Sequence, residues 1–208
     1  MNKDDRSIRA VLWDLGGVIV RTLDWSGRAR WEKRSGLSPH ELEHIVFRGE
    51  MGVRASLGQA NSDDVWTWVL QHLGFPKSER AAIERDFFSG DQVDNELISF
   101  IHSLRPGYKT GIISNAWPEL RHWLEVEWCI ADAFDHIVIS AEVGILKPDP
   151  RIYHLALNKL GVAPSETIFI DDFKENVVGA LDIGMQAIHF RTTEQVTSEL
   201  RALLDLPL

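Results

Sequence analysis

Acidic, hydroxyl and amine side chains follow short apolar runs at four places in this 208-residue sequence. The four segments are WDLGGV (Trp13–Val18), SNA (Ser114–Ala116), LKPDP (Leu146–Pro150) and FIDDF (Phe169–Phe173). We expect each preceding apolar run to form a buried strand. In an open parallel sheet, ligands bind beyond the carboxyl ends of the strands. The ordered set therefore predicts a site for a divalent cation and a phosphoryl group.

Three carboxylates, on Asp14, Asp171 and Asp172, are predicted to converge at this edge of the sheet. They would repel one another strongly, so all three cannot stay ionised without a compensating charge. A hard cation such as Mg²⁺ prefers oxygen ligands and supplies that charge. The same cation would bring an anionic nucleophile, Asp14, toward an anionic phosphoryl group, so that the reaction passes through an aspartyl-phosphate.

The remaining polar groups suit the oxygens of the phosphoryl group. Lys147 would add a second positive charge, and it is predicted to act in catalysis together with Asp14. The glycine pair Gly16–Gly17 gives a tight turn whose backbone N–H groups can approach a ligand closely. The predicted phosphate-binding groups are Ser114, Asn115, Gly17 and Lys147.

Five apolar runs and the helical patterns between them would position these groups. The predicted strands are Ile8–Trp13, Thr110–Ser114, His136–Ile139, Thr167–Ile170 and Gln186–Phe190. The predicted helices of this part are Val93–Leu104, Pro118–Val126, Arg151–Leu160 and Glu175–Ile183. Strands that alternate with helices indicate an α/β fold, a doubly wound, Rossmann-like parallel sheet.

The stretch 21–91 breaks this alternation, because it shows helical patterns and no convincing strand. The helical windows are Arg28–Arg34, Pro39–Phe47, Asp63–Leu73 and Ser78–Phe88. We expect a helical cap of residues 21–91 inserted after the first strand, and a catalytic core of residues 1–20 and 92–208. The cap tryptophans are expected to fill a small core of their own, whereas Trp117 has the best claim to border the site.

Composition excludes several classes of function. The formal net charge is −9 without a basic tail, so nucleic-acid binding is excluded as the main role. The eight histidines show no ligand spacing, so no zinc is expected. The start MNKDDRSIRAVLWDL does not read as a signal peptide, and no apolar stretch approaches the ~20 residues that span a bilayer. A single cysteine, Cys129, fits a reducing compartment, so we expect a cytoplasmic protein without a membrane partner, as a monomer or a homodimer.

The four segments in this order resemble the haloacid dehalogenase superfamily, in its branch with a helical cap after the first motif. They are more similar to its phosphatases than to its dehalogenases, which need no metal. The likeness covers nearly the whole chain, and in the cap it is one of architecture only. The resemblance implies a Mg²⁺-dependent hydrolase of a small phosphorylated metabolite, with Asp14 as nucleophile and metal ligand. The other metal ligands it implies are the carbonyl oxygen of Gly16, the Asp172 carboxylate, and Asp171 either directly or through a water molecule.

One position departs from the pattern of that family. Most of its phosphatases carry a second aspartate two positions after the nucleophile, which protonates the leaving group, and here that position is Gly16. A general acid is worth ~10²–10⁴-fold in rate. The loss restricts the substrate to a better leaving group, such as an anomeric or acyl phosphate, unless the cap or a substrate hydroxyl takes the role. The alternatives are a metal-independent 2-haloacid dehalogenase and a non-catalytic module that binds a phosphorylated ligand.

Overall fold

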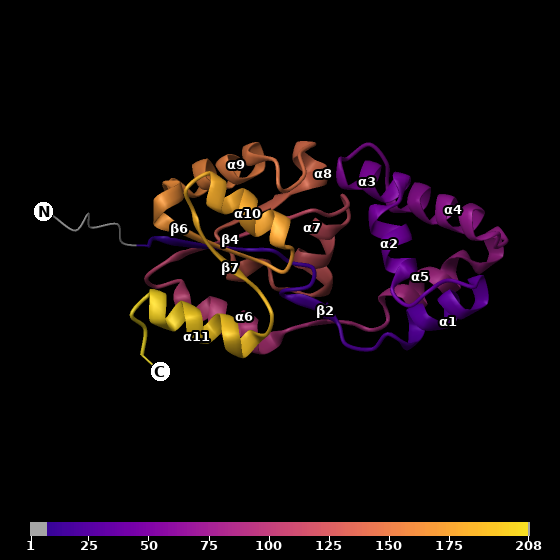
Figure 1. Ribbon diagram of the computed structural model, residues 1–208, viewed down its shortest axis with the longest axis horizontal. Helices are drawn as coiled ribbons and strands as arrows, with labels where there is room; N and C mark the ends of the chain where they lie inside the picture. Colours follow the sequence, from indigo (N-terminus) through magenta and orange to yellow (C-terminus); the bar gives the residue numbers. More distant parts are fainter. Residues whose placement is uncertain (1–7, 208) are drawn as a thin grey trace, which may run out of the picture.

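A five-stranded parallel sheet forms the centre of the core in the computed structural model (Figure 1). Residues 8–207 are described, so predicted core residues 1–7 and 208 lie outside them. The strands are β1 (Ala10–Trp13), β4 (Lys109–Ser114), β5 (His136–Ile139), β6 (Thr167–Asp171) and β7 (Gln186–His189), in the order β5-β4-β1-β6-β7. β1 lies in the middle, with Trp13 opposite Ile112 on one side and Ile170 on the other. The predicted doubly wound α/β fold is confirmed.

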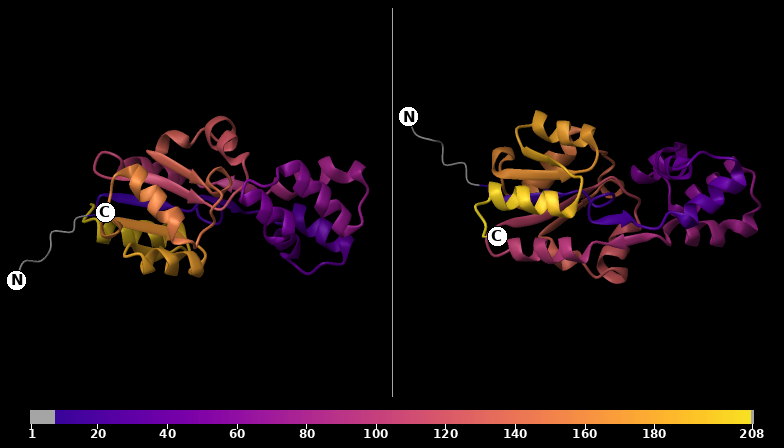
Figure 2. Two further views of the ribbon diagram at one scale, coloured as in Figure 1. Left: turned by 90° about the horizontal axis from the view of Figure 1, so that it is seen from above. Right: turned by 60° about the horizontal axis from the view of Figure 1, so that its bottom comes forward.

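Helices cover both faces of the sheet (Figure 2). One face packs against α9 (Pro150–Leu160) and α10 (Lys174–Asp182), and the other against α6 (Asn95–Leu104) and α11 (Thr193–Leu203). Successive side chains of a strand point to opposite faces, so Leu12 joins the first cluster and Val11 the second. Since both faces are buried, polar side chains of this sheet gather where the strands end.

Five helices form the cap beside the core (Figure 1). They are α1 (Ser26–Ser35), α2 (Glu41–Arg48), α3 (Glu50–Ser56), α4 (Ser62–Leu73) and α5 (Arg80–Phe88). Their apolar faces enclose a separate hydrophobic cluster, in which Trp31 and Trp66 are almost fully buried. These two tryptophans fill the core of the cap, as the sequence predicts.

A two-stranded antiparallel ribbon joins the two parts, where the sequence was expected to contain no strand. β2 (Val20–Thr22) pairs with β3 (Asp91–Val93), and Val20 lies opposite Val93. That expectation for residues 21–91 is wrong, because three-residue strands with polar sequences, VRT and DQV, carry no detectable alternation. Both crossings between core and cap run through this ribbon.

Several short elements differ from the prediction. Helix α3 was missed because Gly49 and Gly52 read as breakers, yet Gly52 packs its bare backbone against the carbonyl of Val46. The predicted helix Pro118–Val126 is a short α7 (Leu120–His122) followed by a π-helical turn, η2 (Trp123–Glu127). The remaining elements are α8 (Ser140–Val143) and the 3₁₀ turns η1 (Lys77–Glu79), η3 (Ala131–Ala133) and η4 (Pro164–Glu166). Among the helices between residues 8 and 207, none is long and apolar enough to cross a membrane.

Candidate active site

Two neighbouring strands bring the predicted carboxylates together. Asp14 directly follows β1, and its N–H donates a 2.8 Å hydrogen bond to the carbonyl oxygen of Ile170 in β6. Asp171 ends β6, and Asp172 follows it. One carboxylate oxygen from each of the three aspartates lies within 4.8 Å of the others. The spacing suits three oxygen ligands around one ion.

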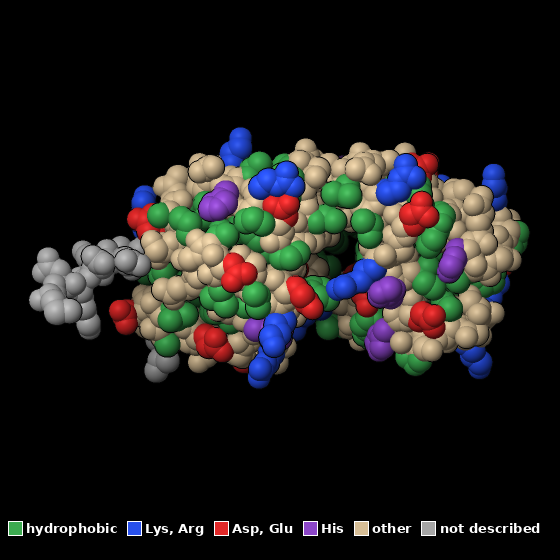
Figure 3. Space-filling view, turned by 45° about the horizontal axis from the view of Figure 1, so that its top comes forward, with side chains coloured by type: hydrophobic (Ala, Val, Ile, Leu, Met, Phe, Trp, Pro, Cys, Tyr) green, Lys and Arg blue, Asp and Glu red, His purple; other side chains and the backbone are tan. Residues whose placement is uncertain are grey.

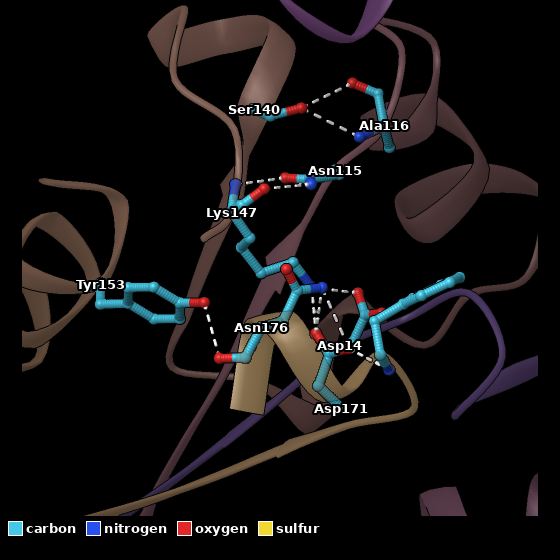
Figure 4. Close-up of polar contacts among 9 residues, drawn as sticks. Asp14, Asn115, Ala116, Ser140, Lys147, Tyr153, Asp171 and Asn176 are labelled. Atoms are coloured by element: carbon cyan, nitrogen blue, oxygen red, sulfur yellow. Dashed lines mark hydrogen bonds and ion pairs between the residues drawn. The ribbon is translucent and has the colours of Figure 1, made fainter. Parts of the chain in front are cut away.

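Lys147 lies among these carboxylates (Figure 4). Its Nζ is 2.6 Å from Oδ1 of Asp14 and 2.7 Å from Oδ2 of Asp171, and only 1% of its side chain is exposed. The residue comes from the loop between α8 and α9. A buried ammonium that touches both aspartates fixes their oxygens relative to each other.

Asn115 anchors the loop that carries Lys147 (Figure 4). Its Oδ1 accepts a 2.8 Å hydrogen bond from the Lys147 N–H, and its Nδ2 donates a 3.0 Å bond to the Lys147 carbonyl. Both polar atoms of this predicted phosphate-binding side chain are therefore occupied by a peptide group. Ser114, at the end of β4, is 4% exposed.

Hydrogen bonds from Phe173 and Asn176 satisfy the carboxylate of Asp171. Oδ1 accepts a 2.7 Å bond from the N–H of Phe173, and the Asn176 amide donates to both oxygens at 3.0 and 3.1 Å. Tyr153 in turn donates its hydroxyl to the carbonyl of Asn176 at 2.9 Å. Asp171 is fully buried, so these donors are what keeps its charge satisfied there.

Asp172 differs from Asp171, because one of its oxygens has no partner. Its Oδ1 is buried without a hydrogen bond. Its other oxygen lies over Gly17, where an added Cβ would come within 2.2 Å of it. Gly17 has a φ of +79° and donates its N–H to the carbonyl of Val20 at 2.9 Å, inside the turn. A glycine is thus required for Asp172 to reach this place, and the unpartnered oxygen of Asp172 would suit a cation ligand.

The carboxyl groups of Asp14 and Asp172 have raised pKa values. Burial, together with the charges of Asp171 and Asp172, raises the pKa of Asp14 from 3.8 to about 7 against the opposing effect of Lys147. Burial and the Asp171 charge raise the pKa of Asp172 to about 6. Burial would lower the pKa of Lys147, but the two adjacent aspartates outweigh it and raise it. Three acids and one ammonium leave an excess of negative charge, which a divalent cation with oxygen ligands would neutralise.

The sequence pattern of the haloacid dehalogenase-like hydrolases matches residues 8–184. The chain belongs to this family. In sequence it is 29% identical to the sesquiterpene phosphatase astK of Aspergillus oryzae, over 95% of this chain and 97% of that protein. It is 31% identical to the mouse acyl-CoA dehydrogenase family member 10 over 98% of this chain, but spans only 20% of that longer protein.

Solved structures share the fold of this haloacid dehalogenase-like hydrolase. A family enzyme of Bacteroides thetaiotaomicron, in complex with magnesium and inorganic phosphate, superposes with a TM-score of 0.78 at 20% identity, over 94% of this chain and 100% of its own. A phosphatase of the family from Thermococcus onnurineus gives a TM-score of 0.61 at 25% identity, over 95% and 98% of the two chains. The architecture of core plus cap is therefore shared along nearly the whole length.

The cap of this hydrolase rests on the core beside the site. Trp117, directly after the SNA segment, packs into the hydrophobic cluster of the cap, with its ring 5.5 Å from that of Phe47. Ser140 in α8 donates its hydroxyl to the carbonyl of Ser56 in α3 at 2.6 Å and accepts the Ala116 N–H at 3.0 Å. A hollow remains between the two parts (Figure 3). Trp117 thus links the segment after β4 to the cap.

The sequence did not predict the residues that hold the site residues and their neighbours in place through hydrogen bonds. Asn176 lies in the first turn of α10, and Ser140 begins α8. The signal for Asn176 was available, because a polar residue interrupts the apolar face of a helix five positions after Asp171. No comparable signal marks Ser140, whose partners, Ser56 and Ala116, are distant in sequence.

Proposed function

We propose that this hydrolase is a Mg²⁺-dependent phosphatase that acts on a small phosphorylated metabolite through an aspartyl-phosphate on Asp14. The observation that carries this proposal is the pairing of Lys147 with Asp14 beside an unpartnered oxygen of Asp172. A nucleophile, a fixed cationic group and an acidic metal site then lie within one small volume.

The metal would be held by Asp14, Asp172 and the carbonyl oxygen of Gly16, with Asp171 completing the acidic set. When bound, the ion neutralises these carboxylates and polarises the phosphoryl oxygens, so that an anionic nucleophile can approach phosphorus. Asp171 already receives hydrogen bonds from Phe173 and Asn176, and it holds Lys147 in place. We therefore assign it mainly a positioning role.

The chain's own residues would carry out two displacements at phosphorus. An oxygen of Asp14 attacks, the bond from phosphorus to the leaving oxygen breaks, and Lys147 offsets the charge on the transferred group. Water then attacks the same phosphorus, the bond from phosphorus to the Asp14 oxygen breaks and releases Asp14 as a carboxylate, and the product leaves as H2PO4⁻ with both protons of that water. Ser114 lies at the end of the neighbouring strand, and its hydroxyl is assigned to the phosphoryl oxygens. The sesquiterpene phosphatase and the Thermococcus phosphatase support this choice of reaction.

The two parts of the chain would have separate tasks in this reaction. Residues 1–20 and 92–208 form the catalytic core, and residues 21–91 form the cap that covers the site and selects the substrate. The ribbon β2–β3 is the double connection between them. Closing of the cap would exclude water from the aspartyl-phosphate until the leaving group departs.

The test is hydrolysis of an activated aryl phosphate by the purified protein with Mg²⁺ and after EDTA treatment. We expect turnover only with the metal, and none in the Asp14→Asn variant. Asp182→Asn, a change to an exposed carboxylate at the end of α10, serves as the matched control and should keep full rate. Full activity of Asp14→Asn would remove Asp14 as the nucleophile.

The same assay separates the two alternative functions. EDTA-insensitive release of halide from a 2-halo acid would identify a dehalogenase, although that reaction leaves the Asp171–Asp172 pair without a task. Tight binding of a phosphorylated ligand, with no turnover and no transfer of a labelled phosphoryl group to the protein, would identify a binding module.

A further inference from the structure

Arg48, the last residue of α2, carries a cationic group from the cap toward the active site. Its guanidinium carbon lies 4.6 Å from the centre of the Phe173 ring, and both side chains are largely exposed. Within residues 8–207 it makes no salt bridge. The cap arginines that do pair with acids are Arg21, Arg28, Arg30, Arg34, Arg80 and Arg85. A cation on an aromatic face keeps its charge available for an anion.

Phe173 connects this guanidinium to the catalytic groups. It directly follows Asp172, and its N–H donates to Oδ1 of Asp171 at 2.7 Å. Arg48 thus rests one residue away from the proposed metal ligand, on the cap side. Figure 3 shows Lys and Arg side chains beside the hollow between cap and core, where a substrate would enter.

The charges of the site leave room for a second anionic group on the substrate. The three aspartates carry −3, Lys147 adds +1, and a divalent cation adds +2, so the loaded site is neutral before the substrate binds. The transferred phosphoryl group then binds through the metal and Lys147. The charge of Arg48 is not needed to neutralise the site aspartates or the acids of the cap. It would therefore complement an anionic group of the substrate a few atoms beyond the reacting phosphorus.

The absence of a side chain at Gly16 restricts which leaving groups can depart from the reacting phosphorus of the substrate. Apart from its chain neighbours, no heavy atom lies within 4 Å of the position of a Cβ at this residue, so no other residue fills the place of the missing side chain. An alcohol that leaves as alkoxide has a conjugate acid about as weak as water, so it leaves poorly without a proton donor. A phosphate monoester that leaves has a second pKa of ~6 and departs at neutral pH without a proton donor.

We infer that the substrate is an organic diphosphate, whose terminal phosphoryl group is taken by Asp14 while Arg48 binds the departing phosphate monoester. The inference rests on the proposed phosphatase function and names its substrate class. An oxygen of Asp14 bonds to the terminal phosphorus, and the bridging P–O bond breaks. Its electron pair stays on the bridging oxygen, which leaves with the monoester as an anion beside Arg48. Water then attacks the aspartyl-phosphate at phosphorus, and inorganic phosphate keeps both protons of that water.

The test compares two substrates with the same tail, butyl diphosphate and butyl phosphate, at saturating Mg²⁺. We expect kcat/KM to favour the diphosphate by at least ~10²-fold, the low end of what a general acid contributes. Arg48→Ala should lower kcat/KM for the diphosphate at least tenfold, and Arg48→Lys should restore part of it. Lys77→Ala is the charge-matched control, since Lys77 follows α4, which runs away from the core (Figure 1), and it should leave the ratio unchanged.

A binding measurement gives a readout that is independent of turnover. Calorimetry with methylenediphosphonate, a non-hydrolysable probe, should show a weaker complex in Arg48→Ala than in wild type or Lys77→Ala. Gly16→Asp should narrow the ratio of kcat/KM between butyl diphosphate and butyl phosphate, since only the alkoxide needs a proton.

The outcomes separate the inference from the function on which it rests. Hydrolysis of an aryl phosphate with equal kcat/KM for the two butyl substrates would overturn the inference and keep the phosphatase. No hydrolysis of any phosphate compound would remove both. If His44→Ala, one turn before Arg48 on α2, abolishes a substantial rate with butyl phosphate, the cap supplies the acid and the leaving-group argument is wrong.

Discussion

Replacing Asp14 with Asn is expected to stabilise the metal-free protein while it abolishes turnover. Asp14 is 6% exposed, and its neighbours Asp171 and Asp172 are acidic. Burial and these charges raise its pKa from 3.8 to about 7 although Lys147 lies 2.6 Å away. Without metal, the folded state therefore disfavours the ionised carboxylate of Asp14. The neutral amide of Asn carries no such charge.

The pH dependence gives both the sign and the size of the effect. For an acid whose pKa is raised on folding, the stabilising contribution is complete below pH 3.8 and is lost as pH rises to about 7. At ~1.4 kcal/mol for each pKa unit, the upper limit of the loss at pH 8 is ~4 kcal/mol. Relaxation of the site reduces this, so we expect Asp14→Asn to gain ~1–3 kcal/mol, or about 2–12 °C in Tm.

Thermal unfolding in EDTA at pH 5 and pH 8 checks this prediction. The gain at pH 5 should be about a third of that at pH 8, because Asp14 is then largely protonated in the folded wild type. Asp149→Asn is the control, since Arg151 lowers the pKa of this exposed carboxyl to about 2, and its loss should bring no gain. An Asp14→Asn variant that is no more stable at pH 8, or equally more stable at both pH values, would refute the reasoning.

Three further outcomes follow from the same site. Gly17→Ala should weaken activation by Mg²⁺ at least tenfold, because its Cβ would meet Asp172. The control Gly74→Ala, at a similar positive φ with open surroundings, should lower only the free energy of unfolding, by the ~1–2 kcal/mol of backbone strain. Equal activation by Mg²⁺ in both variants would contradict this. Asn176→Leu should lower the free energy of unfolding by ~1–3 kcal/mol and kcat by ~10–100-fold, because the fully buried Asp171 carboxylate loses its amide donor. An unchanged kcat would show that Asn176 does not position Asp171 for the reaction. Magnesium titrations at several pH values should show the affinity falling as pH drops below about 7 and then about 6, where protons compete for Asp14 and Asp172; a pH-independent affinity would place the ion elsewhere.

The sequence predicted the sheet and the meeting of its polar ends because both follow from local patterns. Continuous apolar runs mark strands buried on two faces, and Asp14 and Asp171 come together once those strands pair in parallel. The order of the strands, with β1 between β4 and β6, then brings Lys147 to both aspartates.

The parts that sequence reasoning missed depend on contacts between distant residues. The ribbon β2–β3 is held by pairing across the whole cap insertion, so its two short polar strands have no local signal. The contact of Arg48 with the Phe173 ring is made between the cap and the core, and it has no signal in the sequence. The hydrogen bonds of the Asn115 side chain to the backbone of Lys147, 32 residues away, also have no signal in the sequence, and the assignment of Asn115 to phosphate stays a prediction.

The most direct test of the central claim is a single-turnover reaction with a ³²P-labelled phosphate donor and Mg²⁺, stopped with acid at millisecond intervals. Digestion and mass spectrometry would then locate any label on the protein. We expect a transient label on the peptide that contains Asp14, which rises before free phosphate and is absent from Asp14→Asn. Phosphate release at full rate without label on the protein at any time would contradict it.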